Sequence, residues 1–232
     1  MYRHMSLRHR HRKAIMYPIN LLLDNCPCLI IGGGSVAFQK AKGLLAANAV
    51  VTVLAPEICP QLQDLVQAGQ IIWQQRPYTP GAEAGYTLLL CCAGDSTANA
   101  AAAKAALARG QLVNVCDKPE ESNWTTPSVI RRGPLLCTIS TNGQAPAFSR
   151  WLRLHWEEKL TPAYGKWIER LAAVRAEAQS SLTSSQARQT FWRQALTDDI
   201  MALVAEGDQA AAEALLRQKL QHFCEEVQHE NH

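Results

Sequence analysis

The sequence has no long apolar run, and this lack excludes a membrane-spanning helix. The longest apolar runs, such as Leu88–Ala93, are far shorter than the ~20 residues that a helix needs to cross a bilayer. The apolar segment of a secretory signal is also missing from its start. With 232 residues, 47% hydrophobic and 19% charged, the chain has the composition of a globular protein. It is long enough to bury a core as one large domain or two small ones.

Acidic residues are missing from the beginning of the chain. None precedes Asp24, whereas residues 3–13 hold five positive charges. The formal net charge of +3 therefore hides a body, residues 14–232, with 18 basic and 20 acidic residues and a charge of −2. Such a body gives no support to nucleic-acid binding. We expect residues 1–15 to be a disordered basic leader that loosely fits a transit peptide, with Met16 as an alternative start.

The eight cysteines lack the spacing of a zinc site. Five of them lie inside apolar runs, where a free thiol acts as a small hydrophobic side chain. These five are Cys28, Cys91, Cys92, Cys116 and Cys137. The pattern predicts reduced, buried thiols in a cytoplasmic protein and not a disulfide framework.

A glycine-rich turn is the most informative motif in the chain. The apolar run Cys28–Ile31 leads into three consecutive glycines, after which the apolar spacing becomes helical. Gly32, Gly34 and Ala37 fill the G-x-G-x-x-G/A pattern of dinucleotide-binding folds. The N–H groups at the helix start would then face a pyrophosphate. Because a glycine turn also occurs in other α/β proteins, the motif depends on its context.

That context is an alternation of strand and helix patterns. Strands are expected at 50–54, 71–75, 86–92 and 111–116, and helices at 35–47, 58–67 and 96–109. This alternation predicts an α/β fold with a Rossmann-type, doubly wound parallel sheet. Ligands of such sheets bind beyond the carboxyl ends of the strands, where the glycine turn, Pro56, Gly94 and Asp117 all fall.

The end of the second predicted strand bears on the choice of nucleotide. An acid that binds the ribose hydroxyls is expected at this end, and Glu57 comes two residues after the strand. No arginine follows the strand immediately, so no partner for a 2′-phosphate is evident. The sequence therefore favours NAD over NADP.

The composition changes after Asp117. Residues 118–128 are polar and indicate an exposed loop, whereas 135–141 has the pattern of a strand. Pro146 is expected to open a helix, and the chain has helical spacing throughout from Thr161. We expect a nucleotide domain over 16–117, a small region over 118–160 and an all-helical domain over 161–232.

Five blocks in a fixed order resemble the precorrin-2 dehydrogenase family, which forms the front half of bacterial siroheme synthase and also exists alone. They are Gly32–Ala37 with Lys40, Val51–Pro56, Asn114–Asp117, Pro127–Leu135 and Ile139–Pro146. The match runs from about Met16 through the C-terminal helices. Each block is weak alone, whereas their order and spacing together are specific.

The resemblance implies an enzyme that oxidises precorrin-2 to sirohydrochlorin with NAD. Some family members also insert Fe²⁺ to give siroheme. A homodimer is implied as well, with 118–160 as its dimerisation region. The methyltransferase half of the fused enzyme does not follow, so methylation is not expected, and neither is a nucleic-acid or membrane partner.

The resemblance also assigns site residues. Asp117 would be the catalytic base and could hold the incoming metal transiently, although it could instead only cap a turn. The cofactor-binding residues would be Gly32, Gly33, Gly34, Ser35, Val36, Pro56, Glu57 and Gly94. Hydroxyl and basic groups would bind the carboxylates of the substrate. We expect these to be Ser140, Thr141, Asn142, Arg131 and Arg150, with Arg132 and Arg153 as further candidates.

Two alternatives remain open at this point. One is a dehydrogenase without chelatase activity, which would share the same motif and the same aspartate. The other is a non-catalytic NAD-binding sensor that acts through the helical segment. Dehydrogenases for alcohols or hydroxy acids are disfavoured, because the sequence has no Tyr-x-x-x-Lys pair or catalytic histidine arrangement near the predicted cleft.

Overall fold

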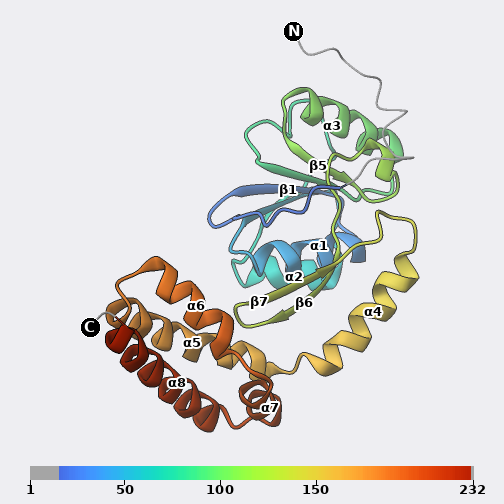
Figure 1. Ribbon diagram of the computed structural model, residues 1–232. Helices are drawn as coiled ribbons and strands as arrows, with labels where there is room; N and C mark the ends of the chain where they lie inside the picture. The colour runs from blue at the N-terminus through green and yellow to red at the C-terminus, as the bar shows by residue number, and fades with distance from the viewer. Residues whose placement is uncertain (1–15, 231–232) are drawn as a thin grey trace. The chain divides into compact units, whose positions relative to one another are not determined.

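A computed structural model describes residues 16–230 of the protein (Figure 1). The leader expected over residues 1–15 lies outside this range. The chain divides into two compact units, the first ending at Thr126 and the second beginning at Pro127. The first unit thus extends beyond the boundary expected at residue 117.

The first unit is built around a five-stranded parallel sheet with the order β3-β2-β1-β4-β5. Its strands are β1 (Pro27–Ile31), β2 (Val50–Leu54), β3 (Ile72–Gln74), β4 (Leu88–Cys91) and β5 (Leu112–Val115). Its helices are α1 (Ser35–Leu45), α2 (Pro60–Gln67), α3 (Ser96–Ala108) and the short 3₁₀ helix η2 (Pro119–Glu121). The chain adds β2 and β3 on one side of β1 and then β4 and β5 on the other. The carboxyl ends of β1 and β4 therefore flank the crevice in which such sheets bind ligands. The predicted Rossmann-type sheet is confirmed.

The strands are apolar along their whole length because both faces of the sheet are covered. Cys28 and Ile30 of β1 lie on the face covered by α1 and α2. Leu29 and Ile31 lie on the opposite face, under α3 (Figure 1). The alanine-rich sequence of α3 lets its backbone approach the sheet closely. These two cores hold the carboxyl edge of the sheet in place.

The segment after β5 differs from the exposed loop expected over residues 118–128. β5 is an edge strand, and its outward backbone N–H groups need acceptors. The side chain of Asn123 accepts a hydrogen bond from the N–H of Val113 at 2.7 Å. The buried side chain of Ser122 accepts a hydrogen bond from the N–H of Val115 at 2.9 Å. The polar composition of this segment therefore serves the edge of the sheet.

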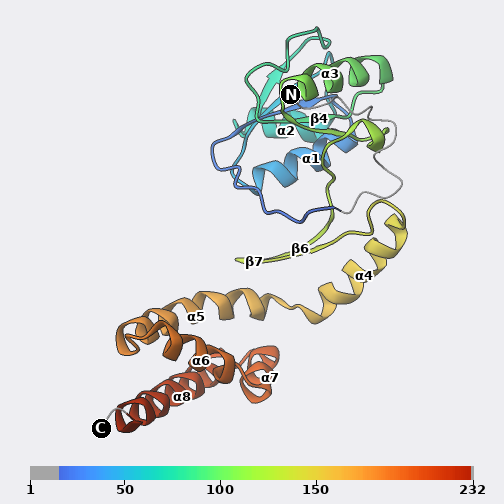
Figure 2. The same ribbon diagram turned by 45° about the horizontal axis from the view of Figure 1, so that its top comes forward.

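The second unit begins with an antiparallel hairpin of β6 (Ser128–Arg132) and β7 (Leu135–Ile139). The helix α4 (Pro146–Lys159) packs against both strands (Figure 2). Strand β6 was not predicted, because Ile130 is the only side chain in it that becomes buried.

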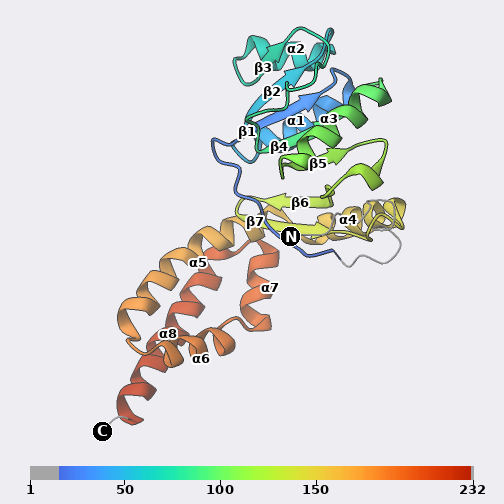
Figure 3. The ribbon, with the colours of Figure 1, turned by 90° about the horizontal axis from the view of Figure 1, so that it is seen from above.

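The rest of the second unit is helical, as expected from Thr161 onward. Its helices are α5 (Pro162–Ser181), α6 (Ser185–Ala195), α7 (Asp198–Glu206) and α8 (Gln209–Glu230). Helix α8 packs against the other three (Figure 3). Trp167, Val174 and Phe191 lie in their common core.

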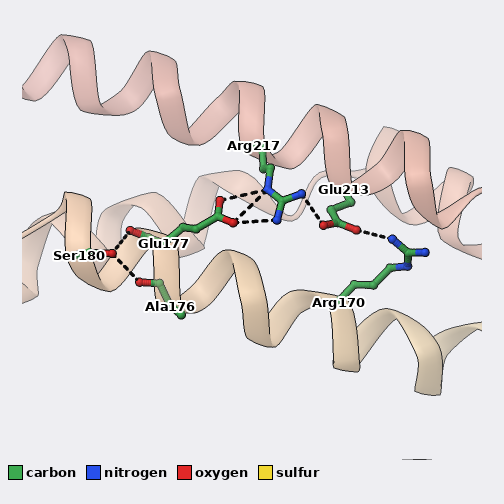
Figure 4. A network of polar contacts seen from close by, with 6 residues as sticks. All are labelled: Arg170, Ala176, Glu177, Ser180, Glu213 and Arg217. Carbon is green, nitrogen blue, oxygen red and sulfur yellow. Dashed lines mark hydrogen bonds and ion pairs between the residues drawn. The ribbon is translucent and has the colours of Figure 1, made fainter.

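A network of ion pairs joins α5 to α8 at the surface (Figure 4). The guanidinium of Arg217 lies 2.7 Å from Glu177 and 2.5 Å from Glu213. Arg170 contacts the same Glu213 at 2.5 Å. Exposed ion pairs contribute little to stability one at a time, whereas several charges in a network can contribute more. Among the described helices, none is long and apolar enough to cross a membrane.

Candidate functional site

The glycine turn joins β1 to α1 at the carboxyl edge of the sheet. Gly32 continues the sheet, since its N–H donates to the carbonyl of Leu54 at 3.0 Å. Its φ of 119° lies in a region that favours glycine. A Cβ at this position would lie 2.6 Å from the backbone of Cys92, at the end of β4. Gly32 therefore allows the turn and the close packing of two strand ends.

The second and third glycines have different surroundings. A Cβ on Gly33 would lie 1.9 Å from the carbonyl oxygen of Glu57, and the carbonyl of Gly33 accepts from the N–H of Cys59 at 2.8 Å. The loops after β1 and β2 are thus packed together. A Cβ on Gly34 would meet no described protein atom within 4 Å. The middle glycine is required by the protein itself, and the third leaves space for a ligand.

Helix α1 begins at this open space. Gly34 is its N-cap and offers no side chain, so the first N–H groups of the helix point out of the turn without a capping group. Ser35 and Val36 are exposed, whereas Ala37 is fully buried against the sheet. An exposed helix start without a side-chain cap is suited to bind an anion such as a pyrophosphate.

Asp117 lies beyond the end of β5, at the same edge. Its side chain is exposed, and its Oδ1 lies 3.4 Å from the amide nitrogen of Asn99. Asn99 belongs to α3 and is only 1% exposed. The same amide group also donates to the carbonyl of Ala93 at 2.9 Å and accepts from its N–H at 3.1 Å. One buried side chain thereby fixes the loop after β4 and contacts the carboxylate after β5.

The sequence analysis did not identify Asn99. The sequence feature that could have identified it is a polar residue on the buried side of a helical segment that is otherwise rich in alanine. A buried amide without a partner would be costly. Such an amide therefore points to a polar group on the neighbouring loops.

The other predicted nucleotide residues lie at this edge too. Pro56 and Glu57 are exposed just beyond β2, and Gly94 is exposed beyond β4. The structure therefore brings together all the cofactor-binding residues predicted from the sequence, with Asp117. A bound dinucleotide would fit this edge, since the turn leaves open space at Gly34 and exposes the helix start.

The predicted substrate residues all belong to the second unit. Thr141 lies in the connection from β7 to α4, where its Oγ1 is 3.0 Å from Oγ of Ser149 and accepts from the N–H of Ala145 at 3.1 Å. Asn142 has a φ of 54°, which its short polar side chain tolerates. Its N–H donates to Oγ of Ser140 at 3.3 Å. These side chains build a turn at the start of α4.

The four arginines considered for the substrate divide into two kinds. Arg131 on β6 and Arg150 on α4 are exposed. Arg132 donates from Nε to the carbonyl of Leu160 at 2.8 Å, and Arg153 forms a close ion pair with Glu157. Arg132 and Arg153 therefore hold parts of the second unit together, which leaves Arg131 and Arg150 as the better candidates.

Fold and site define a class: a nucleotide-binding protein of the Rossmann type, with a carboxylate at the carboxyl edge of its sheet. Comparisons with known proteins agree. Residues 19–128 match a family model described as putative NAD(P)-binding. Residues 163–220 match one described as the sirohaem synthase dimerisation region.

Relatives and solved structures point the same way. The chain is 35% identical over 204 residues to a siroheme synthase of Chromobacterium violaceum and 36% identical over 204 residues to one of Photorhabdus laumondii. Both alignments cover 88% of this chain and 43% of the relative, so the chain spans less than half the length of these enzymes. A solved structure of SirC, a precorrin-2 dehydrogenase, has the same fold. Its TM-score is 0.72 at 21% identity, and the match covers 90% of this chain and 98% of that one. These matches confirm the expected resemblance: the chain is a relative of the siroheme synthases.

Proposed function

We propose that the protein is an NAD-dependent precorrin-2 dehydrogenase that forms sirohydrochlorin in siroheme biosynthesis. One observation carries the proposal: an exposed carboxylate, Asp117, stands at the same sheet edge as an open glycine turn with the dinucleotide pattern. The similarity to siroheme synthases supports the choice of substrate. The cytoplasmic location expected from the sequence is part of the same proposal.

In this proposal the pyrophosphate of NAD lies over the glycine turn and the start of α1. Gly34 gives the space for it, and Ser35 and Val36 offer backbone N–H groups. Pro56 and Glu57 would lie beside the adenosine ribose, and Gly94 would border the nucleotide beyond β4. NAD supplies the hydride acceptor for the oxidation. No arginine stands immediately after β2, which supports NAD over NADP.

Asp117 would act as the general base. Oxidation of the macrocycle removes a hydride together with a proton from carbon or nitrogen, and a carboxylate at this edge can accept that proton. Its exposure lets it pass the proton to water. The amide of Asn99, 3.4 Å from Oδ1, would orient the carboxylate and leave its other oxygen for the substrate.

The second unit would supply contacts to the substrate. Arg131 and Arg150 are exposed cations suited to carboxylates, and Ser140, Thr141 and Asn142 offer polar groups at one turn. In this proposal, these five residues bind the peripheral carboxylates of precorrin-2.

We also propose a homodimer. The resemblance assigns its contacts to 118–160, whereas the matched dimerisation region covers 163–220. Helix α4 lies within 118–160 and exposes Phe148, Trp151 and Trp156. These exposed side chains support a contribution of this segment to the dimer contact.

Insertion of Fe²⁺ into sirohydrochlorin is a second step of the same proposal. Iron would be a substrate here, held transiently by Asp117 while the macrocycle supplies the nitrogen ligands. Among residues 16–230, no group of three or more His, Cys, Asp or Glu side chains is placed to hold a metal. The observation that favours the step is that the carboxylate of Asp117 is exposed. Co²⁺ insertion into sirohydrochlorin without NAD would test it separately from the dehydrogenase step.

The dehydrogenase is tested by an anaerobic assay in which NADH appears as precorrin-2 is consumed. Asp117→Asn is expected to lower turnover on the order of 10²–10⁴-fold while NAD still binds. Glu120→Gln, an exposed residue close in the sequence, is the matched control and should keep full turnover. If the wild-type protein binds NAD and produces no NADH, it is the sensor and not the enzyme. Full turnover in Asp117→Asn would remove the assigned role of the carboxylate.

A further inference from the structure

Two cysteines face each other at the ends of β4 and β5. In the parallel register of these strands, Cys91 lies opposite Val115. Cys92 and Cys116 are the next residues, and the N–H of Cys116 donates to the carbonyl of Cys91 at 3.0 Å, which continues the pairing. Their side chains therefore leave the sheet on the same face, and their sulfur atoms lie 3.0 Å apart. A disulfide with a bond length of ~2.05 Å requires the two sulfurs to approach by only about 1 Å.

The two sulfurs share a hydrogen bond in which either thiol can be the donor. Both cysteines are only partly buried, so neither is enclosed in the core of the sheet. Two thiols at this distance can act as a nucleophilic sulfur and a resolving one.

Other cysteines at the sheet lack these features. Burial raises the pKa of Cys28 to about 11 and that of Cys91 to about 12, so both stay in the unreactive thiol form at neutral pH. Cys91 lies in the core under α3 and so points to the opposite face from Cys92. Oxidation is therefore expected to favour the pair formed by Cys92 and Cys116 over Cys28 and Cys91.

We propose that Cys92 and Cys116 are a redox modification site, whose reversible disulfide bond slows the reaction at the neighbouring Asp117. The effect on turnover rests on the proposed dehydrogenase function, whereas formation of the bond does not. The oxidant would be a hydroperoxide or a low-molecular-weight disulfide.

The chemistry of the step is balanced with either oxidant. With hydrogen peroxide, the thiolate of one cysteine attacks an oxygen, the O–O bond breaks, and a sulfenic acid forms with release of water after protonation. The sulfur of the other cysteine then attacks the sulfenic sulfur, loses its proton and displaces a second water as the S–S bond forms. Two thiols are oxidised and one peroxide is reduced to two waters. With a small disulfide, two exchange steps give the same bond and two small thiols.

The position of the pair explains why the bond would affect the reaction. Cys116 directly precedes Asp117, and the backbone of Cys92 lies against Gly32 in the glycine turn. Drawing the two sulfurs together moves the ends of β4 and β5 while the sheet beneath them stays packed. Misplacement of a catalytic group by 1 Å can cost on the order of 10²-fold in rate. A shift of a fraction of that distance predicts a loss of turnover of about tenfold.

The experiment uses the full chain, treated with hydrogen peroxide or with oxidised glutathione and then with a thiol reductant. Peptide mapping under non-reducing conditions should find a bond between Cys92 and Cys116. NADH formation should fall about tenfold on oxidation and return on reduction. The double variant Cys92→Ser, Cys116→Ser, which has neither sulfur, should keep its turnover through the same treatment. Cys137→Ser, on β7 of the second unit, is the matched control and should respond like the wild-type protein.

The results of the oxidation experiment test the disulfide and its effect on turnover separately. No cross-linked peptide, or a bond between other cysteines, overturns the site. A bond between Cys92 and Cys116 that leaves turnover unchanged overturns the effect on the reaction. If the reduced protein forms no NADH, the dehydrogenase proposal fails, and the peptide map still tests the site by itself.

Discussion

The amide nitrogen of Asn99 in helix α3 lies 3.4 Å from Oδ1 of Asp117, beyond the end of β5. The same amide binds both backbone groups of Ala93. A side chain that is almost completely buried thus connects a helix, the loop after one strand and an exposed carboxylate after another. In the proposed function, Asn99 would be a positioning residue for Asp117, and this role can be separated from its contribution to stability.

Asn99→Asp is expected to change the pH dependence of the reaction. The substitution keeps the shape of the side chain but places a second carboxyl group next to Asp117. Because like charges disfavour ionisation, the acid limb of the pH–rate profile should move to higher pH. The measurement is NADH formation from precorrin-2 as a function of pH.

Asn99→Ala provides the comparison for that experiment. It removes two hydrogen bonds to Ala93 without adding a charge, and should lower the free energy of unfolding by about 2 kcal/mol. Its acid limb should move less than that of Asn99→Asp, because the carboxylate loses a hydrogen-bond donor but gains no neighbouring charge. If both variants lose rate without any movement of the limb in Asn99→Asp, Asn99 has only a structural role.

Gly34→Ala should separate ligand binding from folding. Its Cβ would meet no described protein atom within 4 Å, and its backbone has an ordinary negative φ of −85°. We therefore expect a stable protein with NAD affinity reduced on the order of tenfold or more, because the methyl group occupies the space assigned to the pyrophosphate. Titration calorimetry with NAD measures the affinity, and thermal unfolding measures the stability.

Gly33→Ala is the matched variant at the neighbouring position. Its Cβ would lie 1.9 Å from the carbonyl oxygen of Glu57, so the loop after β2 must move or the protein must lose stability. We expect a lower unfolding temperature for Gly33→Ala and an unchanged one for Gly34→Ala. Unchanged NAD affinity in Gly34→Ala would contradict the assigned path of the nucleotide.

The sheet and its carboxyl edge could be predicted from the sequence because they depend on local patterns. Continuous apolar runs fixed β1, β2 and β4, and the spacing of Gly32, Gly34 and Ala37 located the turn and helix that follow. Contacts that depend on how segments meet in three dimensions were not accessible in this way. The hydrogen bonds of Ser122 and Asn123 to β5 and the packing of Gly33 on Glu57 depend on tertiary structure.

The pair formed by Cys92 and Cys116 shows the same limit. The sequence predicted both as small apolar side chains within strands, which their partial burial supports. That their sulfurs lie 3.0 Å apart follows only from the register of β4 and β5. A strand pattern predicts which face a residue occupies, but it does not predict the register of the neighbouring strand.

Glu83 should make the first unit sensitive to acid. Its carboxylate is fully buried, forms an ion pair with Arg109 and accepts a hydrogen bond from the hydroxyl of Tyr78 at 2.9 Å. Burial raises the pKa of Glu83, but hydrogen bonds from the backbone, Tyr78 and Arg109 outweigh it and leave the pKa below 4.5. A folded-state pKa below the unfolded one means that the stabilisation is present above about pH 4.5 and is lost as the pH falls through the folded value.

The measurement is the free energy of unfolding as a function of pH. Glu83→Gln should be destabilised by about 2 kcal/mol at pH 7, with a shallower loss of stability on acidification than the wild-type protein. Tyr78→Phe keeps the carboxylate and removes one donor, so it should be intermediate. An acid dependence of Glu83→Gln as steep as that of the wild-type protein would show that other groups control it.

Thr141 tests whether a predicted substrate residue also has a structural role. Its Oγ1 accepts from the N–H of Ala145 and lies 3.0 Å from the hydroxyl of Ser149, so it holds the start of α4. Thr141→Val keeps the shape and removes the hydroxyl, and should lower the free energy of unfolding by about 1–2 kcal/mol. Thr141→Ser keeps the hydroxyl and should be nearly as stable as the wild-type protein. If the hydroxyl also binds precorrin-2, Thr141→Val will raise KM at a temperature where it is fully folded, whereas an unchanged KM would leave Thr141 with the turn alone.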